Sequence, residues 1–296
     1  MGSLVAFGDS YLDSGAALTV SRGAVEAHVP DAKLLPAPPG SPLYADGRWS
    51  DGPSMVEHVA RALDRPLHNF AIGGARAAGG NYHAWLSYFV DTGLAAQVES
   101  YALTLRGSRV PADTVFVIAA GANDFFQYED FHQPGYISLD GGLRLSPAVI
   151  AARAAYCVAA AVSRLTTLGG ERFVVSGAYA LEQVPFIAEA GVSVERANSF
   201  VRAFDAALAD ELAHVSGAPV VEVFPAAEEM RHLAVDGAAH GLADTRSPCQ
   251  PMLPSPGPRR GPPDRYFWWD EYHPTAAVHR LLGDSLLQLV VRAGWG

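Results

Sequence analysis

Short apolar runs alternate along the chain with longer segments in which apolar residues recur at helical spacing. The short runs are bounded by Gly, Asn or Asp, and five of them predict strands, at 4–7, 67–72, 114–119, 172–175 and 219–224. Five longer segments predict helices, at 53–63, 94–105, 147–168, 194–215 and 275–291. This alternation is typical of βαβ units and predicts a three-layer α/β/α sandwich around a five-stranded, mainly parallel sheet.

Proline and glycine mark the ends of these elements. Pro53 and Pro147 stand where the first turn of a helix tolerates proline, and Gly169 and Gly170 follow the third predicted helix as a stop signal. Seven prolines between 241 and 265 argue against regular structure there and predict a long loop. No repeat or linker divides the 296 residues, so we expect one domain, 1–296, with a Pro-rich loop at 241–266.

Composition narrows the possible partners. The chain is 49% hydrophobic and 18% charged, which is typical of a globular protein with a packed core. A formal net charge of -10 argues against binding to nucleic acid or anionic lipid, because both require clustered Lys and Arg. The pair Arg259 and Arg260 lies in a Pro/Gly segment and does not change this expectation. Neutral small molecules are the favoured substrates.

Compartment and assembly are less constrained by the sequence. No run approaches the roughly 18 apolar residues that span a membrane. The first predicted strand begins at Leu4, which leaves no room for a leader, so we expect a cytoplasmic protein or an exported one whose leader has been removed. Cys157 and Cys249 are expected to be free thiols, although a disulfide between them stays open, as does the oligomeric state.

A serine follows the first predicted strand. Ser10 lies in a Gly-containing turn, and in open α/β sheets the carboxyl edge of the strands is where ligands bind. Its hydroxyl can point into the crevice, and its backbone N–H can donate to a developing oxyanion. The alternative interpretation is a helix N-cap, a position that Ser and Asp both favour.

Asp270 and His273 stand three positions apart, between the Pro-rich loop and the last predicted helix. Residues at this spacing in a tight or helical turn face the same way. His273 could then accept a proton from Ser10 while Asp270 fixes the imidazole tautomer and stabilises its charged form. Capping of the following helix is the alternative explanation for the pair.

Two further segments offer hydrogen-bond donors at the same sheet edge. The second strand leads into Gly73 and Gly74, where the backbone can approach a substrate closely. The third strand leads into Asn123, whose side-chain amide can donate another hydrogen bond. An Asx-turn that closes the strand is the alternative interpretation of Asn123.

The Gly-rich stretch does not match a nucleotide site. A dinucleotide fingerprint that begins at Gly73 requires glycine at positions 75 and 78, and both are alanine. A phosphate loop that begins at Gly74 continues with Gly80 and Asn81 where Lys and then Ser or Thr are required. Both nucleotide interpretations fail.

A metal site is also not expected. Four possible ligands recur at every fourth position: His232, Asp236, His240 and Asp244. Gly237 and Gly241 interrupt the helix that would align them, so we expect no metal there.

Aromatic residues gather in two groups. Trp85, Tyr88 and Phe89 are interpreted as core and loop anchors. The second group comprises Phe125, Phe126, Tyr128 and Phe131. It follows Asn123 and could line an acyl or alcohol pocket, or equally anchor the core. The candidate substrate-binding residues are Trp49, Phe125 and Phe126.

These segments, in this order, resemble blocks I, II, III and V of the GDSL, or SGNH, hydrolase family over nearly the whole chain. The resemblance implies a flavodoxin-like fold, no cofactor, and a triad of Ser10, Asp270 and His273. It also implies an oxyanion hole formed by Ser10, Gly74 and Asn123. Asp13 and Asp124 match acidic positions of blocks I and III, where we interpret them as structural supports.

Residues 47–53 and 267–270 are similar to the lipase, phospholipase and acetylesterase branch of that family. The sequence departs from it at Tyr11, where the family name has Leu, and at Cys249, which lacks the second cysteine of relatives that carry a bridged pair. The resemblance implies a serine esterase for carboxylic esters, with short acyl or acetyl groups favoured and lipid esters possible. An acyltransferase and an inactive binding protein are the alternatives.

Overall fold

A single parallel sheet forms the centre of the computed structural model, which describes residues 2–129, 145–189 and 194–296. Its strands are β1 (Leu4–Gly8), β2 (Leu67–Asn69), β3 (Val115–Ala119), β4 (Arg172–Ser176) and β5 (Val220–Phe224). They are paired in the order β2-β1-β3-β4-β5, and every pair is parallel. The predicted α/β fold with a five-stranded parallel sheet is therefore confirmed.

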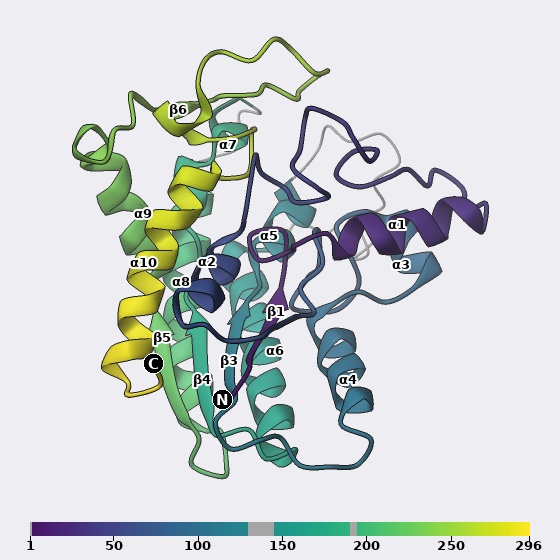
Figure 1. Cartoon of the computed structure of the whole chain (residues 1–296), viewed down its shortest axis with the longest axis vertical. Helices are drawn as coiled ribbons and strands as arrows, with labels where there is room; N and C mark the ends of the chain where they lie inside the picture. The colour runs from purple at the N-terminus through teal and green to yellow at the C-terminus, as the bar shows by residue number, and fades with distance from the viewer. Residues whose placement is uncertain (1, 130–144, 190–193) are drawn as a thin grey trace.

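Helices cover both faces of this sheet. They are α1 (Ala16–Glu26), α2 (Met55–Ala62), α3 (Ala84–Phe89), α4 (Leu94–Thr104), α5 (Ala122–Glu129), α6 (Pro147–Thr167), α7 (Pro185–Glu189), α8 (Val194–Ala213), α9 (Ala226–Val235) and α10 (Ala276–Arg292). Helices α2 and α10 pack together on one face, and α6 packs between α4 and α8 on the other (Figure 1). All five predicted helices are present, whereas α1, α3, α5, α7 and α9 were not predicted.

The strand order places two chain crossovers at one point. The chain leaves β1 toward β2 on one side and returns as β3 on the other, and the last residues of β1 and β3, Gly8 and Ala119, are aligned. Both strands are completely buried, which explains their continuous apolar sequences. A crevice opens at such a switch point in doubly wound folds. In Figure 1 the long connections gather over this upper end of the sheet.

Two of the three predicted helix boundaries agree with the structure. Pro147 is the first residue of α6, and the side chain of Ser146 caps that helix by accepting from the Val149 amide. Gly169, at φ +101°, adopts the left-handed conformation that ends α6. The prediction for Pro53 is wrong: α2 begins at Met55, because Ser54 is its N-cap.

The prediction that 241–265 has no regular structure is wrong at both ends. Strand β6 (Asp244–Pro248) pairs with β7 (Tyr266–Trp268) in a separate two-stranded parallel sheet, and a short 3-10 helix η3 (Pro263–Arg265) precedes β7. Proline is compatible with β6 because Pro248 is the last residue of an edge strand, where the missing N–H removes few hydrogen bonds between the strands. The irregular part is the stretch between Cys249 and Pro262.

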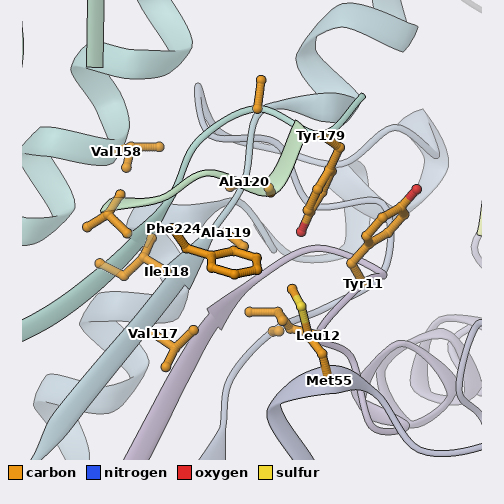
Figure 2. Packing of buried hydrophobic residues seen from close by; sticks show 14 of the residues in the cluster. Tyr11, Leu12, Met55, Val117, Ile118, Ala119, Ala120, Val158, Tyr179 and Phe224 are labelled. Atoms are coloured by element: carbon orange, nitrogen blue, oxygen red, sulfur yellow. The ribbon is translucent and has the colours of Figure 1, made fainter. Parts of the chain in front are cut away.

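Aromatic rings organise the core on either side of the sheet. The rings of Phe7 and Phe116 stack at 6.2 Å between centroids and those of Phe116 and Phe173 at 5.1 Å, which joins β1, β3 and β4. Near the end of β1, the rings of Tyr11 and Tyr179 stack at 4.0 Å (Figure 2). Rigid packing of this kind fixes the carboxyl end of β1.

Helix α6 is similar to a membrane span in length and composition. Within the described residues it alone is long and apolar enough to cross a membrane by length and composition, with a mean hydropathy of 1.5, which corrects the expectation that no run approaches this size. Half of that stretch is buried inside the fold, as in a core helix. Cys157 lies half-buried on α6, and Cys249 is buried after β6; neither forms a disulfide.

Candidate active site

Ser10 lies in the turn that follows β1. This turn requires glycine at position 8, where φ is +151° and a Cβ atom would lie 2.0 Å from the Ala119 carbonyl oxygen. The chain therefore passes close to the end of β3, and the Asp9 amide donates to that carbonyl at 3.2 Å. The Asp9 carboxylate accepts from the Tyr11 amide at 3.1 Å, which tightens the turn around Ser10. Ser10 itself is half-buried at the cavity wall.

His273 and Asp270 meet Ser10 at this edge. The Nε2 atom of His273 lies 2.9 Å from Ser10 Oγ, and Nδ1 lies 2.8 Å from Asp270 Oδ2. Ser10 and His273 are 263 positions apart in the sequence. With Nδ1 donating to the carboxylate, Nε2 is free to accept the Ser10 proton. The structure thus brings together the three residues that the sequence predicted as a triad.

A compact turn orients the acidic residue. Asp270 Oδ1 accepts from the amides of Tyr272 and His273, at 2.8 and 2.7 Å. The Trp269 amide donates to the His273 carbonyl at 2.7 Å and closes the turn. Burial acts to raise the pKa of Asp270, but the attraction and hydrogen bond of His273, the Tyr44 hydroxyl and the Tyr272 amide together hold it below its usual value. Asp270 is therefore an anion at neutral pH.

The glycine pair after β2 shows which amide faces the cavity. The Gly73 amide donates to Asp13 Oδ2 at 2.7 Å, so it is already used. Gly74 lines the cavity and has φ +79°, and a Cβ atom there would lie 2.4 Å from Asn81 Oδ1. Within the described ranges, neither the Gly74 amide nor the Ser10 amide donates to another protein group. These two N–H groups are therefore available to a ligand.

Asn123 lies at the start of α5, directly beyond β3, and lines the same cavity. Its Nδ2 atom donates one hydrogen bond to the Ala75 carbonyl at 3.0 Å, which fixes the side chain against the loop that carries Gly74. The second N–H of that amide is left for the cavity. Ser10, Gly74 and Asn123 thus offer donors from the ends of three neighbouring strands.

Asp13 and Asp124 hold these loops together. Asp13 is 1% exposed and accepts from four backbone amides, those of residues 15, 16, 17 and 73, and from the indole of Trp49. Asp124 is 2% exposed and accepts from the amides of Ala77 and Ala78. These contacts join the block that carries Ser10 to the Gly-rich loop, in keeping with the predicted structural supports.

The cavity in front of Ser10 has a volume of about 270 Å³. Most of its wall is apolar, formed by Leu34, Leu35, Pro36, Tyr82, Phe126, Met252, Leu253 and Tyr272. Most of these residues stand in long connections that the sequence did not connect with the site, and no motif there could have indicated them. Lys33, the only lysine of the chain, lies exposed at the rim.

The candidate substrate-binding residues have different outcomes. Trp49 and Phe126 line the cavity, but Phe125 does not. Phe125 is completely buried, and its ring lies 5.2 Å from that of Phe200 on α8, so its prediction is wrong. Phe131 and the side chain of Tyr128 lie outside the described residues. In the other aromatic group, Tyr88 is 75% exposed and therefore is not a core anchor.

Three further titratable groups lie around the triad. Burial lowers the pKa of His83 on the cavity wall to about 3, with a smaller contribution from Lys33, and burial likewise lowers that of His279 to about 3. Both imidazoles are therefore neutral at physiological pH. Burial raises the pKa of Asp9 to about 7, against the opposing effects of the Tyr11 amide and His273.

The residues once considered for a metal do not share a helix face. Helix α9 ends at Val235, and residues 237–240 form a separate 3-10 turn. Across 2–129, 145–189 and 194–296, His, Cys, Asp and Glu form no group of three that could hold a metal ion.

Comparison with known proteins identifies the family. The sequence model of GDSL-like lipases and acylhydrolases matches residues 4–286. The chain belongs to this family. This is the family that the four sequence blocks resemble, so that prediction is confirmed.

Curated relatives of this GDSL hydrolase are distant. The chain is 26% identical to the thermolabile hemolysin of Vibrio parahaemolyticus over 96% of its own length and 63% of that protein. It is 25% identical to the phosphatidylcholine-sterol acyltransferase of Aeromonas hydrophila over 83% of its length and 64% of that protein. A GDSL esterase/lipase of Arabidopsis thaliana is 24% identical over 97% of this chain and 85% of that protein. The chain thus spans a little under two thirds of the first two relatives.

Among solved structures, an alpha/beta hydrolase enzyme from the metagenome of Lake Arreo in Spain has a TM-score of 0.48 at 14% identity. The match covers 98% of this chain and 95% of that one.

Proposed function

We propose that this GDSL hydrolase cleaves carboxylic esters through an acyl-enzyme on Ser10. The observation that carries the proposal is the continuous hydrogen-bonded chain of Asp270, His273 and Ser10, with contacts of 2.8 and 2.9 Å, at the wall of a cavity. Ser10 Oγ attacks the ester carbonyl carbon and its proton passes to His273 Nε2. The tetrahedral intermediate then expels the alcohol, which takes the proton from His273.

Water completes the cycle at the same groups. His273 accepts a proton from water, whose oxygen attacks the acyl carbon, and the acid leaves as Ser10 recovers its proton. Asp270 remains an anion throughout and stabilises the imidazolium form of His273. In both steps a negative charge develops on the former carbonyl oxygen.

The unused donors around Ser10 support a role in binding this charge. The amides of Ser10 and Gly74 and the side chain of Asn123 come from the ends of β1, β2 and β3 and border one cavity. Preformed donors of this kind stabilise a tetrahedral intermediate by about 3 to 4 kcal/mol each, because they need no reorganisation during the reaction.

The cavity favours a short to medium acyl group. Its volume of about 270 Å³ is just below the roughly 300 to 1,000 Å³ of ordinary ligand pockets, and its wall is mostly apolar. Esters with acetyl to medium-length acyl groups therefore fit the proposal best. The phosphatidylcholine-sterol acyltransferase and the esterase/lipase among the relatives support including lipid esters among the candidates.

A panel of nitrophenyl esters from acetate to palmitate tests the proposal. We expect the wild-type rate to be greatest for the shorter chains, and Ser10→Ala to reduce kcat by at least about 1,000-fold. Ser216→Ala, at an exposed serine far from the cavity, is the matched control and should keep the wild-type rate. Labelling of Ser10 by a fluorophosphonate should require His273. Equal rates in wild type and Ser10→Ala would refute Ser10 as the nucleophile.

Acyl transfer is the second candidate, favoured by the acyltransferase among the relatives. An alcohol would replace water at the same acyl-enzyme, so both reactions share every step up to release of the first alcohol. Adding a primary alcohol to the nitrophenyl ester assay distinguishes them. Formation of the new ester in preference to the free acid would identify a transferase, and free acid alone would identify a hydrolase.

A further inference from the structure

One contact to the triad comes from a segment that the proposed mechanism does not use. The hydroxyl of Tyr44, in the long connection between α1 and α2, lies 2.6 Å from Asp270 Oδ2, across 226 positions of sequence. Burial raises the pKa of Tyr44 well above its usual value, with a further contribution from the charge of Asp270. The hydroxyl therefore keeps its proton and donates it to the carboxylate.

This hydrogen bond differs from the others that Asp270 accepts. The amides of Tyr272 and His273 belong to the same turn as Asp270 and both donate to Oδ1. In the part of the chain that the structure describes, Tyr44 is the donor to Oδ2 from outside that turn. His273 Nδ1 contacts both carboxylate oxygens, Oδ2 at 2.8 Å and Oδ1 at 2.9 Å. The Tyr44 hydroxyl thus fixes the one of these two oxygens that the turn itself does not hold.

The backbone just before Tyr44 is clamped in place. The indole N–H of Trp269, the residue before Asp270, donates to the Leu43 carbonyl at 3.0 Å. The Arg259 guanidinium donates to the Pro42 carbonyl at 3.1 Å and lies over the Trp269 ring at 4.9 Å. The Pro-rich segment and the turn that carries Asp270 therefore both help to hold Tyr44 in position.

We propose that Tyr44 is a positioning residue of the triad: its hydroxyl fixes the Asp270 carboxylate in the plane that aligns His273 with Ser10. The inference rests on the proposed function. Without this donor, Oδ2 has no partner other than the imidazole, and the amides of Tyr272 and His273 hold the carboxylate through Oδ1 alone, so its plane is less firmly fixed. A misaligned imidazole slows proton transfer but leaves the cavity wall intact.

Loss of the hydroxyl also changes the electrostatics in a predictable direction. A donor to Asp270 stabilises its negative charge, so removing that donor leaves more of the charge to attract the imidazolium form of His273. In a plot of kcat/KM against pH, the fall on the acidic side (the acid limb) should then move to higher pH. The other ionisable groups close to the pair, namely Asp9, Tyr11, Glu271 and His279, are unchanged by the substitution.

Tyr44→Phe, assayed with the best nitrophenyl ester across pH 5 to 9, tests the inference. We expect kcat to fall about 10-fold, the amount that a hydrogen bond to a charged group is worth, while KM stays near the wild-type value and the acid limb moves upward. Tyr266→Phe on β7 is the matched control, because the Tyr266 hydroxyl makes no hydrogen bond within the described residues, and it should reproduce both wild-type values.

The outcomes separate this inference from the proposed function. If Tyr44→Phe has the wild-type kcat, and its kcat/KM falls at the same acidic pH as in wild type, while Ser10→Ala is inactive, the role of Tyr44 alone is overturned. An active Ser10→Ala would overturn the proposed function itself. If Tyr44→Phe does not fold, Arg259→Met weakens the clamp from an exposed position while keeping the hydroxyl. A fall in kcat at constant KM then supports the inference, and unchanged kcat overturns it.

Discussion

Replacing Asp13 with asparagine should destabilise the protein and disturb the oxyanion donors together. The carboxylate is 1% exposed and accepts from the amides of Gly15 and Ala16 at one oxygen and from those of Ala17 and Gly73 at the other. An asparagine amide has one oxygen, so in either orientation at least two buried N–H groups lose their acceptor. Each unsatisfied donor costs about 1 to 3 kcal/mol.

Part of that loss is offset. Burial raises the pKa of Asp13 despite its donors, so the substitution also removes the cost of burying a charge. We expect a net loss of about 3 kcal/mol in the free energy of unfolding, a large share of the roughly 5 to 15 kcal/mol that domains have. Urea unfolding measures it, and kcat should fall in the folded variant because Gly73 adjoins Gly74.

The same chemical change at an exposed site is the control for this experiment. Asp236→Asn, between α9 and the following 3-10 turn, should change the free energy of unfolding by less than about 0.5 kcal/mol. A loss below about 1 kcal/mol in Asp13→Asn, with kcat retained, would refute the reasoning that Asp13 holds the Gly-rich loop.

Two further predictions concern the same blocks. Gly73→Ala should shift tryptophan fluorescence and lower kcat, because a Cβ atom at position 73 would lie 2.0 Å from Trp49 Nε1. Gly257→Ala is the control: a Cβ atom there would have its nearest neighbour at 3.6 Å, so neither quantity should change. Burial raises the pKa of Asp9 from 3.8 to about 7, so the folded state holds a proton that the unfolded state has lost, and wild-type stability should fall as pH rises through this window. Asp9→Asn should not show this fall, which is at most about 4 kcal/mol over 3.2 pH units. If wild type and Asp9→Asn gave parallel curves of unfolding free energy against pH, the prediction would be wrong.

Groups that directly follow a strand could be predicted from the sequence. Ser10 and Asn123 come within a few residues of β1 and β3, whose continuous apolar sequences identify them as buried parallel strands. The carboxyl ends of parallel strands meet at one edge, so local patterns were enough to place the two residues together. Asp270 and His273 were paired by their spacing, and their turn keeps both side chains on one side.

The aromatic wall could not be predicted in the same way. The pattern of apolar residues did not indicate α5, so Phe125 and Phe126 were treated as equivalent candidates for the pocket. In a helix, consecutive side chains point about 100° apart. Phe125 therefore faces Phe200 in the core, and Phe126 faces the cavity. One unrecognised helix is sufficient to separate two neighbouring candidates, one at the cavity and one in the core.

Side-chain contacts that reach the site from between α1 and α2 carry no local signal in the sequence. Tyr44 and Trp49 stand in an irregular connection, yet they donate to Asp270 and Asp13, respectively. Neither contact follows from periodicity, since each joins side chains whose separation in space is set by the packing of two distant loops. The sheet thus fixes the proposed catalytic groups at its carboxyl edge, while loop packing fixes the groups that orient them. This difference explains why the proposed triad could be predicted from the sequence and its supporting hydrogen bonds could not.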